Sequence, residues 1–385
     1  MNRQTLCGNR GVRGDKASPE GGSAIVIAGG GTGGHLFPGI AIAEAFREKD
    51  PGNRVLFVST GRPLEVSALA GKRFDLRRIS VKGLKGKGRL DQFLSAIKIP
   101  GAVLESIRIL KQFKPAVVIG VGGYSSGPVA LAAWLLGIRV VIHEQNVIAG
   151  MTNRILARLA YRICLSFDSI PRGINPEKAV ITGNPVRKEF LETPGRIREP
   201  APEKPFTVLI IGGSQGAHRI NMTLLDALEH IEKKDRFFLI HQTGELDEDV
   251  VRKRYSALGM KGDVRAFFGD MASQYRKADL VICRAGATTV AEITAIGKPA
   301  VFIPFPYAAD NHQELNARSL ADRGAAELIL ETELTGELLA GRIRYFVSDP
   351  KALIRMASRV QTFARPDAAR DILALSFSQK RLPAA

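Results

Sequence analysis

The chain has 385 residues, of which 45% are hydrophobic and 24% charged, as expected for a water-soluble globular protein of roughly two domains. No uncharged apolar run reaches the ~18 residues of a transmembrane helix, and the three cysteines are too scattered for a disulfide framework or a metal cluster. The net charge of +17 is lopsided: residues 1–190 carry 28 Lys and Arg against 13 Asp and Glu, whereas residues 191–385 carry 27 against 25. This imbalance indicates an anionic partner, either a nucleic acid or a membrane surface, or else a solvated basic face.

The N-terminal half reads as a tail followed by an α/β domain. Residues 1–22 are polar and glycine-rich, which predicts a disordered basic tail and not a secretory signal. Apolar runs and helix-length segments then alternate through residues 23–190, which predicts a doubly wound domain with a parallel sheet. The predicted strands are Ala24–Ala28, Val55–Ser59, Ala116–Gly120 and Val140–His143, and the predicted helices are Pro38–Lys49, Gln92–Phe113 and Val129–Leu136.

The same pattern restarts after a proline-rich stretch. Residues 191–206 contain several prolines and few apolar residues, so we interpret them as a linker. Residues 207–349 form a second predicted α/β domain, which opens with "FTVLII" and continues with strands at Phe237–His241, Val264–Phe267, Leu280–Cys283 and Ala300–Ile303. Residues 350–385 are helical in pattern, and a two-domain layout of this kind would allow them to pack back on the first domain, although the sequence itself does not show that contact. Two such sheets would face a central cleft with the carboxyl ends of their strands.

A glycine loop follows the first strand, in "AIVIAGGGTGGHLFPG". Gly29, Gly31 and Gly34 satisfy the G-x-G-x-x-G pattern of nicotinamide-binding proteins, but such a site needs an acid at the end of the second strand. Ser59–Gly61 stand there and no acid occurs before Glu65, which disfavours a dinucleotide. The loop still suits an anion, through its amides and the helix dipole. His35 ends the loop, either as a helix cap or as a group aimed into the cleft.

Two further segments of the first domain have loops at strand ends. "GVGGYSSGP" predicts either a second half of a diphosphate pocket or a tight strand-to-helix turn. Together the two loops offer Gly30, Gly31, Gly122, Gly123, Tyr124 and Ser125 to such a diphosphate. "VVIHEQNVIAG" places His143, Glu144, Gln145 and Asn146 at a strand end, either as ligand contacts or as a polar turn that caps the next helix.

The second domain repeats this chemistry. Ser214 in "GGSQGAH" precedes a helix N-terminus, and "CRAGATTVAEI" places Thr288 and Thr289 at another, with Glu292 one turn further on. A carboxylate at Glu292 can accept two ribose hydroxyls, or it can simply complement the helix dipole. The polar "DNHQ" opens a further helix, as a binding site or as an ordinary cap. No metal is predicted, because Asp247–Asp249 reads as a solvated helix start.

Seven segments carry a family resemblance. "GGGTGGH", "GVGGYSSGP", "HEQNVIAGMTNR", "GNPVR", "GGSQGA", "CRAGATTVAEI" and "DNHQELNA" occur in this order between Gly29 and Ala317. The chain resembles the MurG family of UDP-N-acetylglucosamine (UDP-GlcNAc) transferases, which act on undecaprenyl-diphosphoryl-muramoyl-pentapeptide in peptidoglycan synthesis. The resemblance implies a GT-B fold and no cofactor. It further implies that UDP-GlcNAc lies mainly on the second domain and the lipid acceptor mainly on the first.

The resemblance also assigns residues to the donor. Glu292 would bind the ribose, Gln313 the sugar hydroxyls, and the backbone of Phe268 the uracil. The donor contacts carried over are Thr32, Gly33, Gly34, Asn146, Arg187, Ser214, Phe268, Ala287, Thr288, Thr289, Val290, Ala291, Glu292 and Gln313. The implied reaction is an inverting displacement by the acceptor's 4-hydroxyl, with His35 as the candidate base; the alternative role of His35 is binding the acceptor diphosphate.

The resemblance gives the basic half a membrane role at the cytoplasmic face of the inner membrane. Apolar residues interleave with the Lys and Arg run there, and Trp134 joins them as a peripheral membrane patch: Leu84, Lys85, Lys87, Arg89, Leu90, Phe93, Leu94, Ile97 and Trp134. Proteins of cell-wall synthesis and division are expected partners. Nucleic acid is disfavoured, because Phe74 is the only aromatic residue between Gly71 and Leu90.

One rival enzyme remains open: a related membrane transferase that makes diacylglycerol glycolipids shares this architecture but should lack the "HEQN" segment. Against the family pattern, the tail before Ser23 is long and Ser59–Leu69 is somewhat variant.

Overall fold

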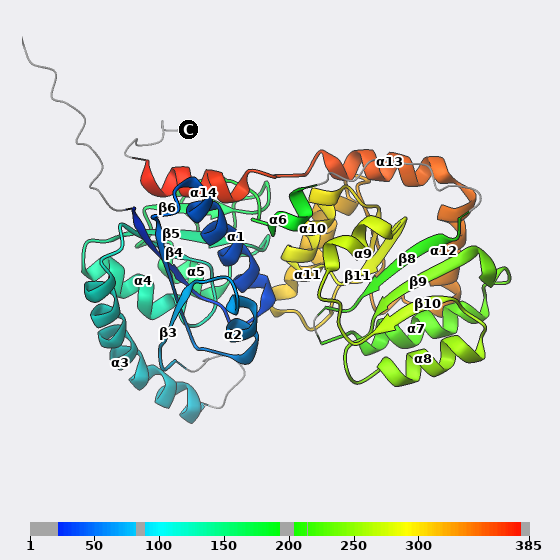
Figure 1. The fold of residues 1–385 in the computed structure, drawn as a ribbon, viewed down its shortest axis with the longest axis horizontal. Helices are drawn as coiled ribbons and strands as arrows, with labels where there is room; N and C mark the ends of the chain where they lie inside the picture. The colour runs from blue at the N-terminus through cyan, green and yellow to red at the C-terminus, as the bar shows by residue number, and fades with distance from the viewer. Residues whose placement is uncertain (1–21, 82–88, 193–203, 214, 379–385) are drawn as a thin grey trace, which may run out of the picture.

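Two parallel β-sheets, each covered by helices on both faces, form the two halves of the molecule and lie side by side (Figure 1). The computed structural model describes residues 22–81, 89–192, 204–213 and 215–378, with only the backbone of residues 89–98. Outside these residues lie almost all of the predicted tail, residues 193–203 of the predicted linker, and Ser214. The side chains of the predicted membrane patch also lie outside, except that of Trp134, which is half exposed.

The first half contains a seven-stranded sheet within the described residues, in the order β3-β2-β1-β4-β5-β6-β7 and parallel throughout. Its strands are β1 (Ala24–Ala28), β2 (Arg54–Ser59), β3 (Asp75–Arg78), β4 (Val117–Gly120), β5 (Arg139–Glu144), β6 (Arg162–Leu165) and β7 (Ala179–Ile181). Its helices are α1 (Gly33–Lys49), α2 (Pro63–Leu69), α3 (Arg89–Phe113), α4 (Ser126–Leu135), α5 (Met151–Leu156) and α6 (Lys188–Leu191).

The second half contains a six-stranded sheet in its described residues, in the order β10-β9-β8-β11-β12-β13 and also parallel. Its strands are β8 (Phe206–Ile211), β9 (Phe237–Gln242), β10 (Gly262–Arg265), β11 (Leu280–Cys283), β12 (Ala300–Phe302) and β13 (Glu327–Leu328). The helices that follow β8 are α7 (His218–Glu229), α8 (Glu248–Ala257), α9 (Met271–Lys277), α10 (Ala287–Ile296), α11 (His312–Ala321), α12 (Gly336–Ser348), α13 (Pro350–Gln361) and α14 (Ala368–Phe377).

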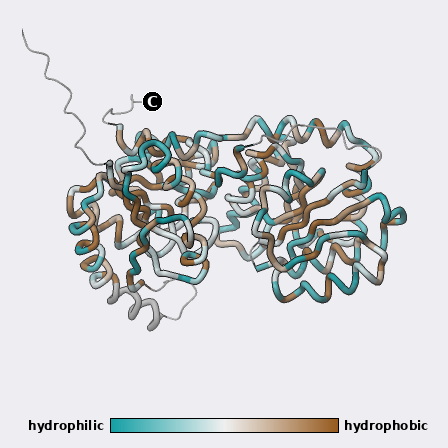
Figure 2. Tube along the Cα trace, viewed as in Figure 1, coloured by the Kyte–Doolittle hydropathy of each residue, from teal (hydrophilic) through white to brown (hydrophobic). Residues whose placement is uncertain are grey.

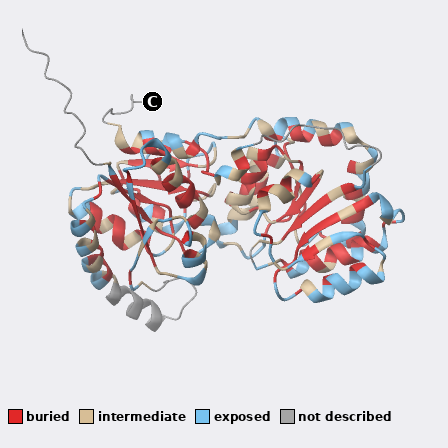
Figure 3. Ribbon diagram, in the orientation of Figure 1, coloured by how far each residue is buried: buried red, intermediate tan, exposed pale blue. Residues whose placement is uncertain are grey.

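The central strands are apolar on both faces because helices cover both faces of each sheet. Figure 2 shows these hydrophobic strands in the middle of each half, and Figure 3 shows that the same strands are buried. The α/β class and the two doubly wound sheets predicted from the sequence are therefore confirmed. Within the described residues, no helix is both long and apolar enough to cross a bilayer.

Several element boundaries differ from the predicted ones. Strand β10 runs over Gly262–Arg265 and not Val264–Phe267, and β3, β6, β7 and β13 were not predicted. Helix α1 begins at Gly33, with Pro38 inside it. Because proline has no N–H, the helical hydrogen bond to the Gly34 carbonyl cannot form. That carbonyl instead accepts a hydrogen bond from Thr288 Oγ1 of the second half, at 3.3 Å.

The C-terminal segment crosses between the halves. Helix α13 lies on the second half, and the chain then returns so that α14 packs against α1 (Figure 1). The rings of Phe46 and Phe377 are stacked with centroids 5.7 Å apart, and Arg139 donates to the Ser376 carbonyl at 2.9 Å. Ile372 is fully buried in the first half's core. The last helix is thus part of the first half's hydrophobic core.

Replacing Ile372 with alanine should therefore destabilise the first half. We expect a loss of about 2–5 kcal/mol in the free energy of unfolding, because a buried aliphatic side chain is removed and a cavity remains. Denaturant unfolding measures the loss. The matched control is Arg370→Ala on the same helix, an exposed position where the change should be small. Equal effects of the two substitutions would show that α14 contributes no core.

Candidate active site

The two glycine loops of the first half lie against each other, backbone to backbone. The loop after β1 donates the Gly30 amide to the Gly122 carbonyl at 3.3 Å. A Cβ on Gly29 would stand 2.2 Å from the Gly122 carbonyl oxygen, and one on Gly123 would stand 2.5 Å from that of Gly30. Gly29, Gly30, Gly122 and Gly123 also have positive φ. Glycine is therefore required here by close approach as well as by backbone conformation.

The amides of Gly30 and Gly31 already have acceptors inside the protein. Gly31 donates to Glu65 Oε1 at 2.6 Å, and Gly30 donates to Gly122. A carboxylate beside Gly31 also repels an anion. These two amides are consequently poor candidates for the acceptor diphosphate that the sequence assigned to them.

In the sequence, Glu65 stood out only as an acidic residue that comes too late in the chain, after the second strand, to bind a dinucleotide. It is buried and lies on α2, where its Oε2 accepts from Ser59 Oγ at 2.9 Å and from the Arg62 amide at 2.7 Å. Together with the Gly31 amide, three donors converge on one carboxylate. Arg62 in turn donates to the Gly31 carbonyl at 3.1 Å. Glu65 and Arg62 therefore fix the conformation of the first glycine loop.

Replacing Glu65 with glutamine should loosen this loop. Glutamine has one acceptor oxygen, so its NH₂ group would face a donor; we expect a loss of about 1–3 kcal/mol of stability. Amide hydrogen exchange at Gly31 should accelerate, and turnover should fall. The control is Ser67→Ala on the same helix, since the Ser67 hydroxyl only bonds the Leu64 carbonyl. If exchange and turnover match those of the unsubstituted protein, Glu65 does not organise the loop.

His35 lies between the two loops in the first turn of α1. Its Nδ1 is 3.0 Å from Thr32 Oγ1, and its imidazole ring packs on Gly122, where a Cβ would come within 2.9 Å of Nε2. Desolvation of this half-buried ring, and secondarily the positive charge that His312 can carry, lower the pKa of His35 to about 4. The imidazole is therefore neutral at physiological pH, which is the form that a general base requires.

The "HEQN" segment at the end of β5 is mostly structural. Glu144 is buried and accepts from the Asn146 amide at 3.0 Å, from the Gly150 amide at 2.9 Å and from Asn153 Nδ2 at 2.9 Å. Burial raises the pKa of Glu144, and these hydrogen bonds oppose the rise. Of the four polar residues, His143, Glu144 and Gln145 are buried, and only Asn146 is partly exposed. The first three thus hold the loop that presents Asn146.

His143 illustrates how this loop is held. Its Nδ1 lies 3.1 Å from Gln145 Nε2, which can only donate, and its Nε2 lies 3.3 Å from the Gly183 carbonyl, which can only accept. The ring is therefore neutral with its proton on Nε2. Burial lowers the pKa of His143 to about 4, in agreement with this assignment.

Helix α10 of the second half meets the first half at its N-terminus and along one side. Thr288 bonds the Gly34 carbonyl, and Glu292 forms an ion pair with Arg187 at 3.1 Å. Arg187 also pairs with Glu189 at 3.2 Å, and its guanidinium lies over the ring of Phe37. Burial raises the pKa of Glu292, and Arg187 opposes that rise. Two predicted donor residues, Arg187 and Glu292, are thereby brought into direct contact.

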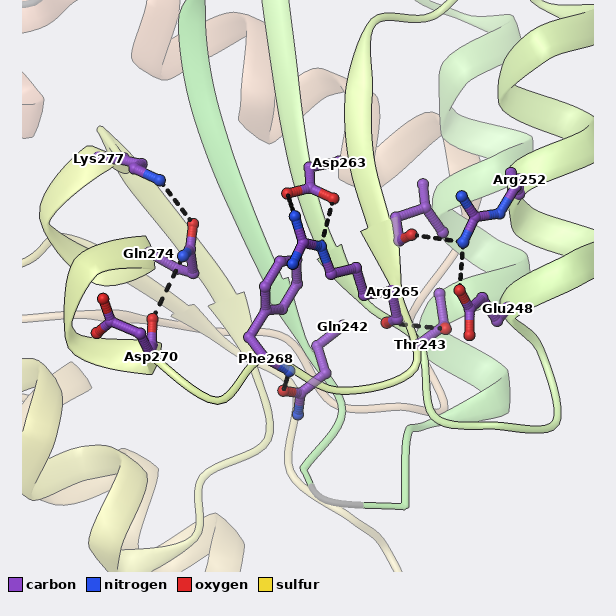
Figure 4. A network of polar contacts seen from close by, with 11 residues as sticks. Gln242, Thr243, Glu248, Arg252, Asp263, Arg265, Phe268, Asp270, Gln274 and Lys277 are labelled. Atoms are coloured by element: carbon purple, nitrogen blue, oxygen red, sulfur yellow. Dashed lines mark hydrogen bonds and ion pairs between the residues drawn. The ribbon is translucent and has the colours of Figure 1, made fainter.

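The far end of the predicted donor site lies on the second half (Figure 4). The Phe268 amide donates to Gln242 Oε1 at 3.1 Å. Of the backbone groups of Phe268, the carbonyl is therefore the one left for the predicted contact with uracil. Gln242 Nε2 in turn donates to the Gly213 carbonyl at 3.0 Å.

The prediction that Asp247 is solvated is wrong. Asp247 is buried, and its carboxylate bonds His218 Nδ1 at 2.8 Å and Asn221 Nδ2 at 2.7 Å.

The remaining predicted residues lie at loop ends. Gln313 uses its Oε1 to accept from the Phe305 amide at 3.0 Å. Tyr124 is exposed on the second glycine loop, whereas Ser125 beside it is buried. Thr32, Gly33 and Gly34 are partly or fully exposed at the opening of α1. The described residues contain no group of three His, Cys, Asp or Glu side chains able to hold a metal ion.

A cavity of about 330 Å³ lies between the halves, beside α10. Ala287, Val290 and Ala291 line it, whereas Thr288 and Glu292 do not. On its wall, Asp168 of the first half pairs with Arg323 at 3.2 Å and with Arg365 at 3.6 Å. The predicted donor residues on α10 thus occupy different sides of one helix.

Comparison with known proteins identifies the family. The glycosyltransferase family 28 N-terminal domain matches residues 25–165 and its C-terminal domain matches residues 207–372. A relative from Anaeromyxobacter sp. (strain Fw109-5) is 48% identical over 90% of this chain and 91% of its own length. Its name is "UDP-N-acetylglucosamine--N-acetylmuramyl-(pentapeptide) pyrophosphoryl-undecaprenol N-acetylglucosamine transferase". The chain belongs to the MurG family.

Other MurG proteins agree with this assignment. A relative of the same name from Syntrophus aciditrophicus (strain SB) is 46% identical over 93% of this chain and 99% of its own length. The crystal structure of Acinetobacter baumannii MurG superposes with a TM-score of 0.75 at 33% identity, covering 92% of this chain and 99% of that one. The resemblance and the GT-B architecture expected from the seven sequence segments are therefore confirmed.

Proposed function

We propose that this MurG-family glycosyltransferase moves N-acetylglucosamine from UDP-GlcNAc to the 4-hydroxyl of undecaprenyl-diphosphoryl-muramoyl-pentapeptide. The observation that carries the proposal is the meeting of both halves at one place. There, the opening of α1 and the Asn146 loop of the first half touch α10 and α11 of the second. A donor on one half and an acceptor on the other would come together at this junction.

The donor would lie along the second half. The Phe268 carbonyl would meet the uracil, the start of α10 the diphosphate, and Asn146 with Gln313 the sugar hydroxyls. Glu292 would accept from the ribose hydroxyls, which requires its ion pair with Arg187 to loosen or to be shared. Arg187 and the N-terminus of α10 would stabilise the negative charge that grows on the β-phosphate as UDP leaves.

The reaction would be a single inverting displacement. The acceptor's 4-hydroxyl oxygen forms a bond to the anomeric carbon while the bond from that carbon to the β-phosphate oxygen breaks. His35 would take the hydroxyl proton, and UDP would leave with the electron pair. A metal ion is not required in this scheme, because helix dipoles and Arg187 supply the positive potential.

The acceptor would reach the site from a membrane surface. The excess of 15 positive charges in residues 1–190 favours attraction to anionic lipid, at about 1 kcal/mol for each cation near the surface. The exposed Trp134 on α4 suits insertion at the lipid interface. We therefore place the protein peripherally on the cytoplasmic face of the inner membrane. Proteins of cell-wall synthesis and division would be its neighbours there.

Transfer of labelled GlcNAc from UDP-GlcNAc to the lipid-linked muramoyl-pentapeptide tests the proposal. We expect transfer to this acceptor, unchanged by EDTA, and none to diacylglycerol. The absence of transfer to the muramoyl acceptor would contradict the function. Transfer to diacylglycerol would favour the glycolipid alternative, and a loss of activity with EDTA would contradict the metal-free chemistry.

A further inference from the structure

Asn316 joins the two halves through one buried side chain. It lies on α11 with no exposed surface. Its Oδ1 accepts from the Val147 amide at 3.1 Å, and its Nδ2 donates to the Ala285 carbonyl at 3.1 Å and to Asn146 Oδ1 at 3.2 Å. A single amide thus bridges the loop after β5 in the first half and the loop before α10 in the second.

The orientation of Asn316 is forced by backbone groups. A backbone N–H can only donate and a backbone carbonyl can only accept, so Val147 takes the oxygen of Asn316 and Ala285 takes its NH₂ group. The second N–H of Asn316 then meets Asn146, which must present its oxygen in return. The orientation of the Asn146 amide therefore follows from two backbone contacts of Asn316.

We propose that Asn316 is a positioning residue that turns the Asn146 amide so that its N–H₂ group, and not its oxygen, meets the substrate. The inference rests on the proposed function only in naming that substrate group, a hydroxyl oxygen of the transferred sugar. Asn146 is partly exposed. Its Nδ2 lies 3.5 Å from Glu144 Oε1, which is an acceptor, and this longer contact agrees with the same orientation of the amide. Asn316 also bonds the carbonyl of Ala285, two residues before α10. It therefore holds the N–H₂ group of Asn146 at a fixed position relative to the N-terminus of α10, where the diphosphate would lie.

Ligand binding tests this role without the lipid acceptor. In Asn316→Ser, the affinity for UDP-GlcNAc measured by calorimetry should fall about tenfold, whereas the affinity for UDP, which lacks the sugar, should stay within about twofold. In an Asn146→Ala background, Asn316→Ser should cause no further tenfold loss. Equal losses for UDP and UDP-GlcNAc, or additive losses in the double variant, would mean that Asn316 only fastens the halves together.

A second variant and a ligand-free measurement keep the test decisive. In Asn316→Asp a carboxylate faces the Ala285 carbonyl and Asn146, so its effect should exceed that of serine. In the protein without ligand, both variants should shift the side-chain amide resonances of Asn146. Ser319→Ala, on the same helix, removes a hydroxyl that bonds only the Asn316 carbonyl and should shift nothing. Unshifted Asn146 resonances would overturn the inference, whereas failure of the unsubstituted protein to bind UDP-GlcNAc would overturn the proposed function instead.

Discussion

Replacing His35 with asparagine should slow sugar transfer by about 10²–10⁴-fold, the usual contribution of a positioned general base. The affinity for UDP-GlcNAc should change far less than turnover, because a general base acts on the acceptor hydroxyl in the transition state and does not hold the donor in the ground state. The measurement is single-turnover transfer with saturating donor and acceptor. Near-normal turnover with unchanged acceptor affinity would contradict the base role. Weakened acceptor binding at normal turnover would assign His35 to the acceptor diphosphate.

The pH profile gives an independent check. The pKa of His35 is lowered to about 4, so the neutral base persists well below the ordinary histidine range near 6.5. Transfer should therefore be flat from pH 8 down to about pH 5 and fall only as the pH approaches 4. A decline centred near pH 6.5 would show that His35 titrates normally. His230→Gln, which removes an exposed histidine, should leave the profile unchanged.

Replacing Arg187 with methionine should destabilise the protein by about 3–5 kcal/mol, because it leaves the Glu292 carboxylate buried without its partner. The affinity for UDP-GlcNAc should fall as well. The pKa of Glu292, already raised by burial, should rise further. A raised pKa favours folding where the carboxyl is protonated, so the destabilisation should shrink as the pH is lowered from 8 to 5. Denaturant unfolding at several pH values measures this.

Two further variants separate charge from packing. Arg187→Met combined with Glu292→Gln removes both charges and should recover much of the lost stability. Arg265→Met breaks an exposed ion pair with Asp263, shown in Figure 4, and should change stability little, because exposed pairs are screened by solvent. If the Arg187 variant is no less stable than the Arg265 variant, the pair with Glu292 is not a buried ion pair in solution.

The sequence pattern predicted the central strands but not the edges. Strands β1, β4, β8 and β11 are covered on both faces and therefore read as continuous apolar runs. Edge strand β3 is mostly exposed and carries Asp75, Arg77 and Arg78, so it has no such run, whereas edge strand β7 is apolar but only three residues long. Strand β6 is buried but short, and it begins with an arginine, so the sequence pattern does not distinguish it from the loop residues around it.

The candidate site was predictable where it depends on local geometry. Glycine loops and polar strand ends mark the carboxyl edge of each sheet because backbone approach and helix N-termini require them. The local sequence pattern cannot reveal which hydrogen-bond donor meets which hydrogen-bond acceptor. The carboxylate of Glu65 bonds an amide 34 residues earlier, and Asn316 bonds a side chain 170 residues earlier. Such contacts follow from how the elements pack, so they emerge only with the fold.

Pro38 leaves one carbonyl of α1 open to a contact with the second half. Without an N–H at this position, the Gly34 carbonyl receives no hydrogen bond from residue 38 and accepts one from the Thr288 hydroxyl. Because this contact is exposed, water can replace Thr288 with little net change in free energy. Opening the junction therefore strands no buried polar group at the start of α1. A proline inside a helix thus supplies a carbonyl acceptor for a contact between the two halves, and water can take the place of its partner.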